Sequence, residues 1–161
     1  MSTPRSFTPD ERRTWVPLAA LLELLPRQLD AQLIRDEELT HFDYFALSML
    51  VLEPEHRLRM TALASMTNAT LPRLSHVVTR LEKRGFVRRD PAPDDARATD
   101  VVITQEGRRK VIHATPGHVA NVRHYVLDAL EPEQFEQLRD IARSVLARLD
   151  PEGRMIVTRQ V

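Results

Sequence analysis

Residues 70–87, TLPRLSHVVTRLEKRGFV, decide the fold because they predict one helix with two different faces. Thr70 is a typical N-cap residue, and Gly85 stands where a helix often ends with a left-handed residue. Apolar residues follow the i, i+3, i+4, i+7 spacing of a single buried face: Leu74, Val77, Val78 and Leu81. The opposite face has no acid and carries short polar groups, a histidine and bases: Pro72, His76, Thr79, Arg80 and Lys83, with Arg73 and Ser75 beside it.

A helix that enters the major groove of DNA needs a face of this kind. Short side chains let the backbone approach the DNA, and Arg or His can donate to the acceptors of guanine. Bases near the C-terminal end of the helix can hold phosphates and fix the register. An ordinary amphipathic helix with a solvated basic face has the same pattern, so the helix alone leaves both interpretations open.

The segments before this helix predict a helix-turn-helix. Thr40, with Asp43 three residues later, is expected to cap a helix that ends before Pro54. A short helix, MTALASMT, is expected from about Thr61, and the turn TNAT joins it to the helix that starts after Thr70.

Two strand-like segments follow, FVRRD at 86–90 and TDVVI at 99–103. About eight residues, 91–98, are expected to separate them, which is longer than a common hairpin loop. Thr104 is expected to cap the next helix. The predicted fold is therefore mainly α with a small β-hairpin wing at 86–103, a winged helix-turn-helix.

Longer helices are predicted on both sides of this lobe. Thr8 and Glu11 form a capping-box pattern, and Pro17 and Pro26 are expected to bend or break the helix that follows. After Thr104 the chain predicts two further helices, the first with a possible kink at 115–117. These helices carry apolar stripes: Leu18, Leu21, Leu22, Leu25, Leu29 and Leu33, then Leu127, Leu130, Phe135, Leu138, Ile141, Val145 and Leu149.

The apolar stripes exceed what one small lobe can cover. Burying them against a second copy would remove that surface from water, at about 25 cal/mol per Å². The alternative is that these helices pack only within one chain.

The charge is distributed unevenly along the 161 residues, although the formal net charge is zero. Residues 56–110 hold 12 Lys and Arg against 6 Asp and Glu, so a basic middle lies between two acidic ends. The local field steers a polyanion, and the total charge does not. A solvated surface of mixed charge is the alternative interpretation.

Several function classes find no support. The chain has no cysteine, which excludes disulfides, thiol redox sensing and cysteine metal sites. Metal sensing is not expected, because His113, His118 and His124 lack the i, i+4 spacing of a helical metal site. The four glycines form no phosphate loop, and no nucleophile elbow or zinc motif is present, so we expect neither an enzyme nor a cofactor. No stretch predicts a membrane helix or a secretory signal, and a cytoplasmic protein is expected.

In order and spacing, these motifs resemble the MarR family of bacterial winged-helix regulators over roughly residues 39–115. No single element is specific, but the ordered set is strong. The elements that carry the resemblance are Leu39-Thr40, Leu63-Ala64, Thr79-Arg80, Leu81, Gly85-Phe86-Val87, Asp95-Ala96-Arg97 and Thr104.

The resemblance implies an obligate homodimer. Residues 8–38 and 105–150 would form the dimer body, and residues 39–104 the DNA-binding lobe. The two recognition helices would enter successive major grooves of a pseudo-palindromic double-stranded operator. Repression by promoter occlusion is the family's usual mode.

Many relatives respond to small aromatic or phenolic anions that bind between body and lobe. Trp15, His41 and Tyr44 are the candidates for such an effector site. The alternative is that they are core or interface aromatics.

The resemblance also gives the wing a function. Arg97 would stand at the family's wing arginine and insert into a minor groove. Asp95 would orient Arg97 or its neighbours through a charge-assisted pair, and Arg88 and Arg89 would lie at the wing base near the backbone. A surface ion pair is the alternative for Arg97.

The sequence therefore predicts a sequence-specific DNA-binding transcriptional regulator, a repressor relieved by a small-molecule ligand. A winged-helix protein-interaction module without DNA binding is the alternative. The predicted DNA-contacting residues are Thr70, Pro72, Arg73, Ser75, His76, Thr79, Arg80, Lys83, Arg88, Arg89, Asp95 and Arg97.

Overall fold

Helices make up most of the chain, and three strands form one antiparallel sheet within the described residues. The computed structural model describes residues 6–155, and of Ala96 only the backbone. The elements are α1 (Pro9–Glu37), α2 (His41–Leu52), β1 (Arg57–Arg59), α3 (Met60–Met66), α4 (Leu71–Lys83), β2 (Val87–Ala92), β3 (Asp95–Ile103), α5 (Gln105–Tyr125), the 3-10 turn η1 (Leu127–Ala129) and α6 (Pro132–Leu149).

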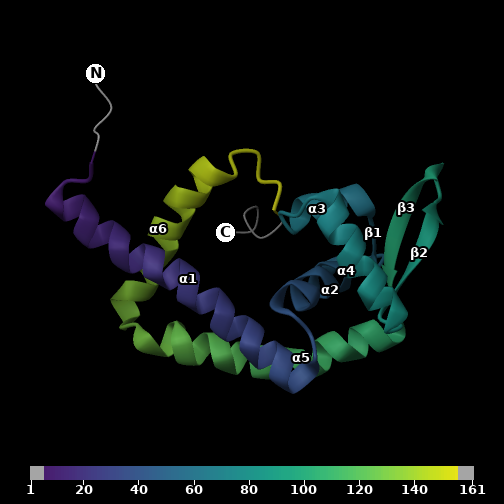
Figure 1. The fold of residues 1–161 in the computed structure, drawn as a ribbon, viewed down its shortest axis with the longest axis horizontal. Coiled ribbons are helices and arrows are strands. Elements are labelled where there is room, and N and C mark those ends of the chain that lie inside the picture. Colours follow the sequence, from purple (N-terminus) through teal and green to yellow (C-terminus); the bar gives the residue numbers. More distant parts are fainter. Residues whose placement is uncertain (1–5, 156–161) are drawn as a thin grey trace.

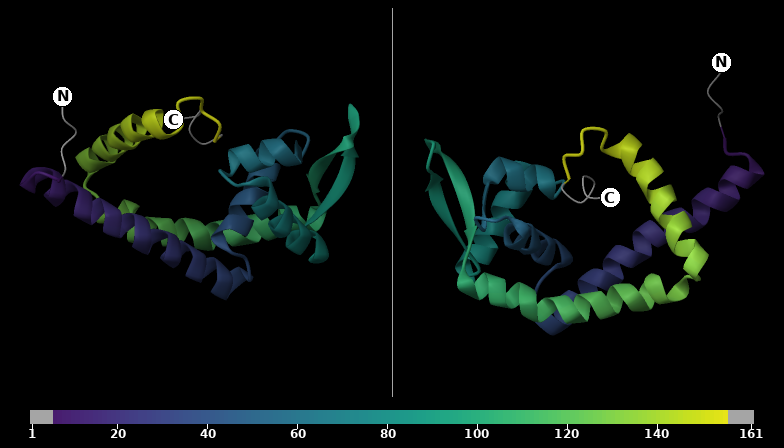
Figure 2. Two further views of the ribbon diagram at one scale, coloured as in Figure 1. Left: turned by 45° about the horizontal axis from the view of Figure 1, so that its top comes forward. Right: turned by 180° about the vertical axis from the view of Figure 1, so that it is seen from behind.

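The long helices and the small lobe occupy different parts of the molecule. α1 and α5 pack along each other, and α2, α3, α4 and the sheet gather at the N-terminal end of α5 (Figure 1). α6 turns back from the other end of α5 (Figure 2). The order of the elements is therefore the predicted one, a winged helix-turn-helix that lies between longer helices in the sequence.

The main cluster of buried apolar residues lies in the winged lobe, and the predicted buried face of α4 is confirmed. The four apolar residues of α4 that share one face are all buried. They pack with residues of α2, the sheet and the start of α5. The sheet has the order β1-β3-β2, so β3 is central and Val101 on it is fully buried.

The predicted caps are confirmed. The hydroxyl oxygen of Thr8 accepts the backbone N–H of Glu11, and the hydroxyls of Thr40, Thr70 and Thr104 cap α2, α4 and α5 in the same way. Gly85 has φ +76°, the left-handed conformation expected after α4.

The wing differs from the predicted long loop. β2 and β3 continue to Ala92 and Asp95, which pair with each other, so only Pro93 and Asp94 lie between the strands. Residues 88–100 hold no large apolar side chain, and Pro91 and Pro93 limit the conformations of this segment, so the sequence indicated a loop. β2 is an edge strand, however, and there a proline can lie without removing a hydrogen bond from the centre of the sheet. A register shift between Pro91 and Ala92 accommodates the first one.

The third strand, β1, is not predicted from the sequence. It has only three residues, and it pairs antiparallel with β3, with Arg57 opposite Val102 and Arg59 opposite Asp100. Such a short segment shows no alternation that a sequence pattern can reveal.

The expected breaks at prolines do not occur. α1 continues through Pro17 and Pro26, and α5 continues through Pro116. Each of these prolines lies on an exposed part of its helix, where water can satisfy a carbonyl that loses its N–H partner.

A buried carboxylate joins α1 to α5. Glu37 accepts hydrogen bonds from Lys110 Nζ at 2.7 Å and from His113 Nδ1 at 2.8 Å. Burial raises the pKa of Glu37, but the hydrogen bonds from Lys110 and His113 outweigh it and hold the pKa below its ordinary value. The contact fixes the end of α1 against the part of α5 nearest the winged lobe.

The body helices leave much apolar surface uncovered within one protomer. None of the residues of α6 is buried. Exposed large apolar side chains lie on all three body helices: Trp15, Val16, Leu18, Leu21, Leu22, Leu24, Ile34, Ile112, Val119, Tyr125, Phe135, Leu138, Ile141, Val145 and Leu149. Over residues 6–155, no helix has both the length and the apolar character that a membrane span requires.

Candidate nucleic-acid interface

The outward face of α4 is built as predicted. The seven residues assigned to it or beside it are all exposed, and so is the cap residue Thr70. The cap hydroxyl of Thr70 accepts the backbone N–H of Arg73 at 3.4 Å. The Arg73 guanidinium lies over the ring of Phe42, 4.5 Å from its centroid. The first turn of α4 is thereby held against α2.

Arg89 fastens the wing base to α4. Its guanidinium donates to the hydroxyl oxygen of Thr79 at 2.9 Å and to the carbonyl oxygen of Ser75 at 3.0 Å. It also forms an ion pair with Glu82, whose carboxylate accepts the backbone N–H of Arg89 at 2.9 Å. These bonds fix the angle between the helix and the wing, so the predicted site residues Ser75, Thr79 and Arg89 form one cluster.

Arg80 has a partner that the sequence does not predict. Its Nη2 pairs with Oδ1 of Asp43 at the start of α2. Arg80 is still about half exposed, with a side-chain exposure of 48%, while Asp43 is at 1%. The pair joins the outward face of α4 to a buried carboxylate.

The wing acids hold arginines of β1. Arg57 Nε lies 3.2 Å from Asp100, and Arg59 Nε lies 3.3 Å from the other oxygen of the same carboxylate. Arg59 also pairs with Asp94 at the wing tip. The wing acids that hold arginines are therefore Asp94 and Asp100 and not the predicted Asp95, and the arginines come from β1, which was not predicted.

At the wing base, Arg88 pairs with Asp90 on the same strand, Nε to carboxylate oxygen at 3.1 Å. Asp95 does not pair with the guanidinium of Arg97. Its Oδ1 accepts the backbone N–H of Arg97 at 3.0 Å, so it shapes the start of β3. The Arg97 side chain is exposed. The ion pairs found within residues 6–155 engage the arginines Arg80, Arg88 and Arg89 of this surface, but not Arg97, His76 or Lys83.

The sequence analysis did not predict the roles of four residues in this arrangement. They are Asp43, which pairs with Arg80, Arg57 and Arg59, which pair with wing acids, and Glu82, which pairs with Arg89. Arg57 and Arg59 alternate along the chain and so lie on one side of a strand, opposite acids of the wing. That alternation is the only signal in the sequence, and it is informative only once β1 is known.

Two of the three predicted effector candidates lie together at the junction of α1, α2 and α5. The rings of His41 and Tyr44 lie 5.6 Å and 4.7 Å from that of His118. Burial lowers the pKa of His41, partly offset by Asp30, and burial and His41 together lower the pKa of His118.

Buried polar atoms without a partner remain at this junction. Within residues 6–155 they are Gln32 Oε1 and His118 Nδ1. Trp15 lies elsewhere on α1, with its ring 6.4 Å from that of Phe7. The structure thus brings His41 and Tyr44 together with His118 and leaves Trp15 apart.

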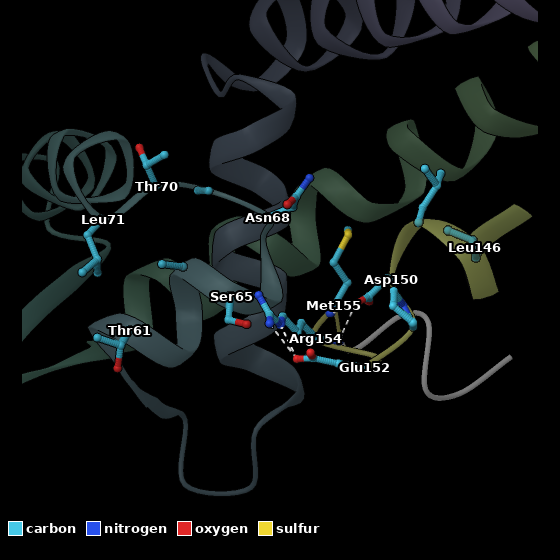
Figure 3. A pocket seen from close by; sticks show the side chains of 14 residues that line it. Thr61, Ser65, Asn68, Thr70, Leu71, Leu146, Asp150, Glu152, Arg154 and Met155 are labelled. Carbon is cyan, nitrogen blue, oxygen red and sulfur yellow. Dashed lines mark hydrogen bonds and ion pairs between the residues drawn. The ribbon is translucent and has the colours of Figure 1, made fainter. Parts of the chain in front are cut away.

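A cavity of about 840 Å³ lies between the α3–α4 corner and the segment after α6. Asn68 and Thr70 line one side of it, and Arg154 and Met155 the other (Figure 3). Arg154 pairs with Glu152 and lies near Ser65 of α3. The segment after Asp150, whose course the sequence does not indicate, thus reaches the winged lobe of its own chain.

Known proteins share this architecture over nearly the whole chain. A model of the MarR family matches residues 39–99. Sco3205, a MarR family transcriptional regulator from Streptomyces coelicolor solved in complex with DNA, is 41% identical, with a TM-score of 0.88 over 94% of this chain and 95% of that one. AbsC, a MarR family transcriptional regulator from the same organism, is 32% identical, with a TM-score of 0.86 over 92% of this chain and 100% of that one.

A curated relative agrees with these structures. The transcriptional repressor MprA of Escherichia coli is 28% identical over 130 residues, which span 81% of this chain and 70% of that protein. Because the identity to Sco3205 extends over nearly all of both chains, and the fold and motifs agree, this chain belongs to the MarR family of transcriptional regulators.

Proposed function

We propose that the protein is a homodimeric repressor that binds a pseudo-palindromic double-stranded DNA site. Residues 8–38 and 105–150 form the dimer body, and residues 39–104 the DNA-binding lobe. The observation that carries the proposal is the acid-free outward face of α4, locked to the wing by Arg89. A basic helix face held at a fixed angle to a wing fits a major groove and the minor groove next to it.

In this proposal α4 enters the major groove and the wing reaches the adjacent minor groove. The exposed donors of His76 and Lys83 face the DNA, together with Arg97 on the wing. The similarity to Sco3205, which was solved with DNA, supports this placement. The contacting surface comprises the residues expected from the sequence, with Arg89 and Asp95 acting on the shape of the surface.

The uncovered apolar stripes of α1, α5 and α6 support the homodimer. A monomer would expose these side chains to water, and a contiguous apolar surface of this kind marks an interaction site. A second copy of the same helices is the partner that the family resemblance implies. The two DNA-binding lobes of one dimer then bind the two half-sites of the DNA.

Relief by a small aromatic or phenolic ligand is part of the proposal. The cluster of His41, Tyr44 and His118 lies where α1 and α5 of the body meet α2 of the lobe. The buried polar atoms of Gln32 and His118 supply hydrogen-bonding capacity for a polar group. A ligand there would alter the junction that sets the position of the lobe. Repression as the sign of regulation is supported by the name of MprA.

The test is binding of the purified protein to the DNA upstream of its own gene, compared with a scrambled duplex, at two salt concentrations. We expect specific binding at two chains per site, weakened by salt because bound counterions are released. If neither this DNA nor a selection from random duplexes gives a preferred sequence, the proposal fails. The remaining interpretation is then a protein-interaction module with a winged-helix fold.

Arg97→Ala is expected to weaken binding to the specific duplex at least about tenfold and to leave the dimer intact. The exposed guanidinium at the wing is the group placed to enter a minor groove, where narrow A·T stretches concentrate negative potential. Fluorescence anisotropy gives the affinity, and light scattering gives the mass. The matched control is Arg123→Ala, an exposed arginine at the far end of α5. Equal affinities for the two variants would remove Arg97 from the interface.

A further inference from the structure

Asp43 is a buried charge with two partners on different elements. Its Oδ2 accepts the backbone N–H of Thr40 at 3.0 Å, which completes the capping box of α2. Its Oδ1 pairs with Nη2 of Arg80 on α4. A carboxylate at 1% exposure needs such partners, because an unpaired buried charge is costly. Asp43 therefore stays in place, and Arg80 is held by it.

Arg80 keeps part of its guanidinium free, and this distinguishes it from Arg89. Arg89 is bound by Ser75, Thr79 and Glu82, which use both of its terminal nitrogens. In the described part of the chain, Arg80 is paired with Asp43 alone. A guanidinium has five N–H donors in a planar fork, so one pair leaves donors for a second acceptor. With 48% of the side chain exposed on the outward face of α4, that acceptor can come from DNA.

Holding the fork in advance favours a specific contact. A free arginine loses many rotamers when it meets a base, whereas one held by a buried carboxylate has already lost them. The carboxylate also sets the plane of the fork, which decides whether two N–H groups reach O6 and N7 of one guanine. The N-terminal turn of α2, which carries Asp43, is itself held in place. Asp30 of α1 accepts the backbone N–H of His41 at 2.8 Å, two residues before Asp43.

We propose that Asp43 is a positioning residue that orients Arg80 for a bidentate contact with guanine, and so determines the base preference at one position of each half-site. The inference rests on the proposed function and deepens it. It assigns sequence specificity partly to a buried residue of α2 that lies outside the recognition helix. In this proposal Arg80 contacts a base, whereas Arg89 holds the wing against α4.

The test uses the full-length protein and a duplex that the wild-type protein selects from a random pool. Affinities are measured for this duplex and for each of its single-base variants. The proteins compared are the wild type, Asp43→Asn, Arg80→Ala and the double variant. Asp43→Asn keeps the shape and an acceptor for the cap but loses the charge that holds Arg80. The matched control is Thr40→Ala, which removes the other partner of the same capping box and leaves the ion pair.

We expect Asp43→Asn and Arg80→Ala each to reduce the preference at the same base position by about tenfold or more, equal to about 1.4 kcal/mol. The double variant should lose no more than either single variant, and Thr40→Ala should keep the wild-type profile. A uniform loss over all base variants, or an unchanged profile, overturns the inference. Selection of no sequence by the wild type overturns the proposed function itself.

A further variant covers the case in which Asp43→Asn does not fold. Arg80→Lys keeps a charge beside Asp43 but lacks the planar fork, so it should fold and lose the preference at the same position. A wild-type profile in a folded Arg80→Lys protein also overturns the inference, because a point charge would then suffice.

Discussion

Gly107→Ala is expected to lower the free energy of unfolding by about 3 kcal/mol, the upper part of the range for overpacked sites. A Cβ atom on Gly107 would lie 2.1 Å from the carbonyl oxygen of Phe86 and 2.8 Å from Cγ1 of Ile103. The carbonyl of Phe86 cannot move away freely, because it accepts the backbone N–H of Thr104 at 3.0 Å. Relieving the clash therefore disturbs the cap of α5 and the base of the wing together.

Urea unfolding followed by circular dichroism measures this effect, with Gly85→Ala as the control. Gly85 has φ +76° and open space around its missing Cβ, so alanine there is strained only by the backbone conformation, at about 1 to 2 kcal/mol. Gly107→Ala should be the more damaging of the two. If both variants had wild-type stability, α5 would not pack against the strand bases as closely as described.

Ile141→Glu is expected to convert the dimer to monomers and to reduce affinity for the specific duplex at least about a hundredfold. Ile141 is 60% exposed in the protomer and lies in the apolar stripe of α6. A glutamate there would place an unpaired carboxylate in the proposed interface, once from each chain, at a cost of several kcal/mol. Separate lobes would then lose the gain from binding two half-sites at once.

Light scattering and anisotropy on the same samples distinguish loss of pairing from loss of the DNA surface. The matched control is Ala147→Glu, which introduces the same residue at an exposed position of α6 that lies about 120° or more from every residue of the stripe. This variant should remain dimeric, because the position lies away from the stripe. A dimeric Ile141→Glu protein would show that α6 does not form the interface.

The sequence predicted the parts of this fold that depend on neighbouring residues. The caps at Thr8, Thr40, Thr70 and Thr104 each involve a bond to a residue three positions away, so their signals are local. The buried face of α4 follows from helical periodicity in the same way. The predicted wing length was wrong because a hydrophilic segment with two prolines indicates a loop unless its strand is known to lie at an edge.

The parts that the sequence could not predict depend on contacts between distant positions. Asp43 and Arg80 are 37 residues apart, and Arg59 and Asp100 are 41 apart. Nothing near Asp43 distinguishes an arginine partner from a capping role alone, because its spacing to Thr40 already accounts for an acid. The placement of Arg80 on an outward face was predicted, but its buried partner required the structure.

The single helix α5 connects the wing to α1, so a small tilt at one end of α5 becomes a larger displacement at the other end. Its N-terminal end is capped by Thr104 at the wing, and near its other end Asn121 and Tyr125 hydrogen-bond Gln28 of α1. With 21 residues it is about 31 Å long, so a tilt of about 5° at one end displaces the other by about 3 Å. In the proposed dimer, opposite tilts change the separation of the two recognition helices by about 5 Å. This change in separation exceeds the roughly 3.4 Å rise of one base pair. A small rotation where α1 meets α5 would therefore prevent both recognition helices from entering their major grooves at the same time.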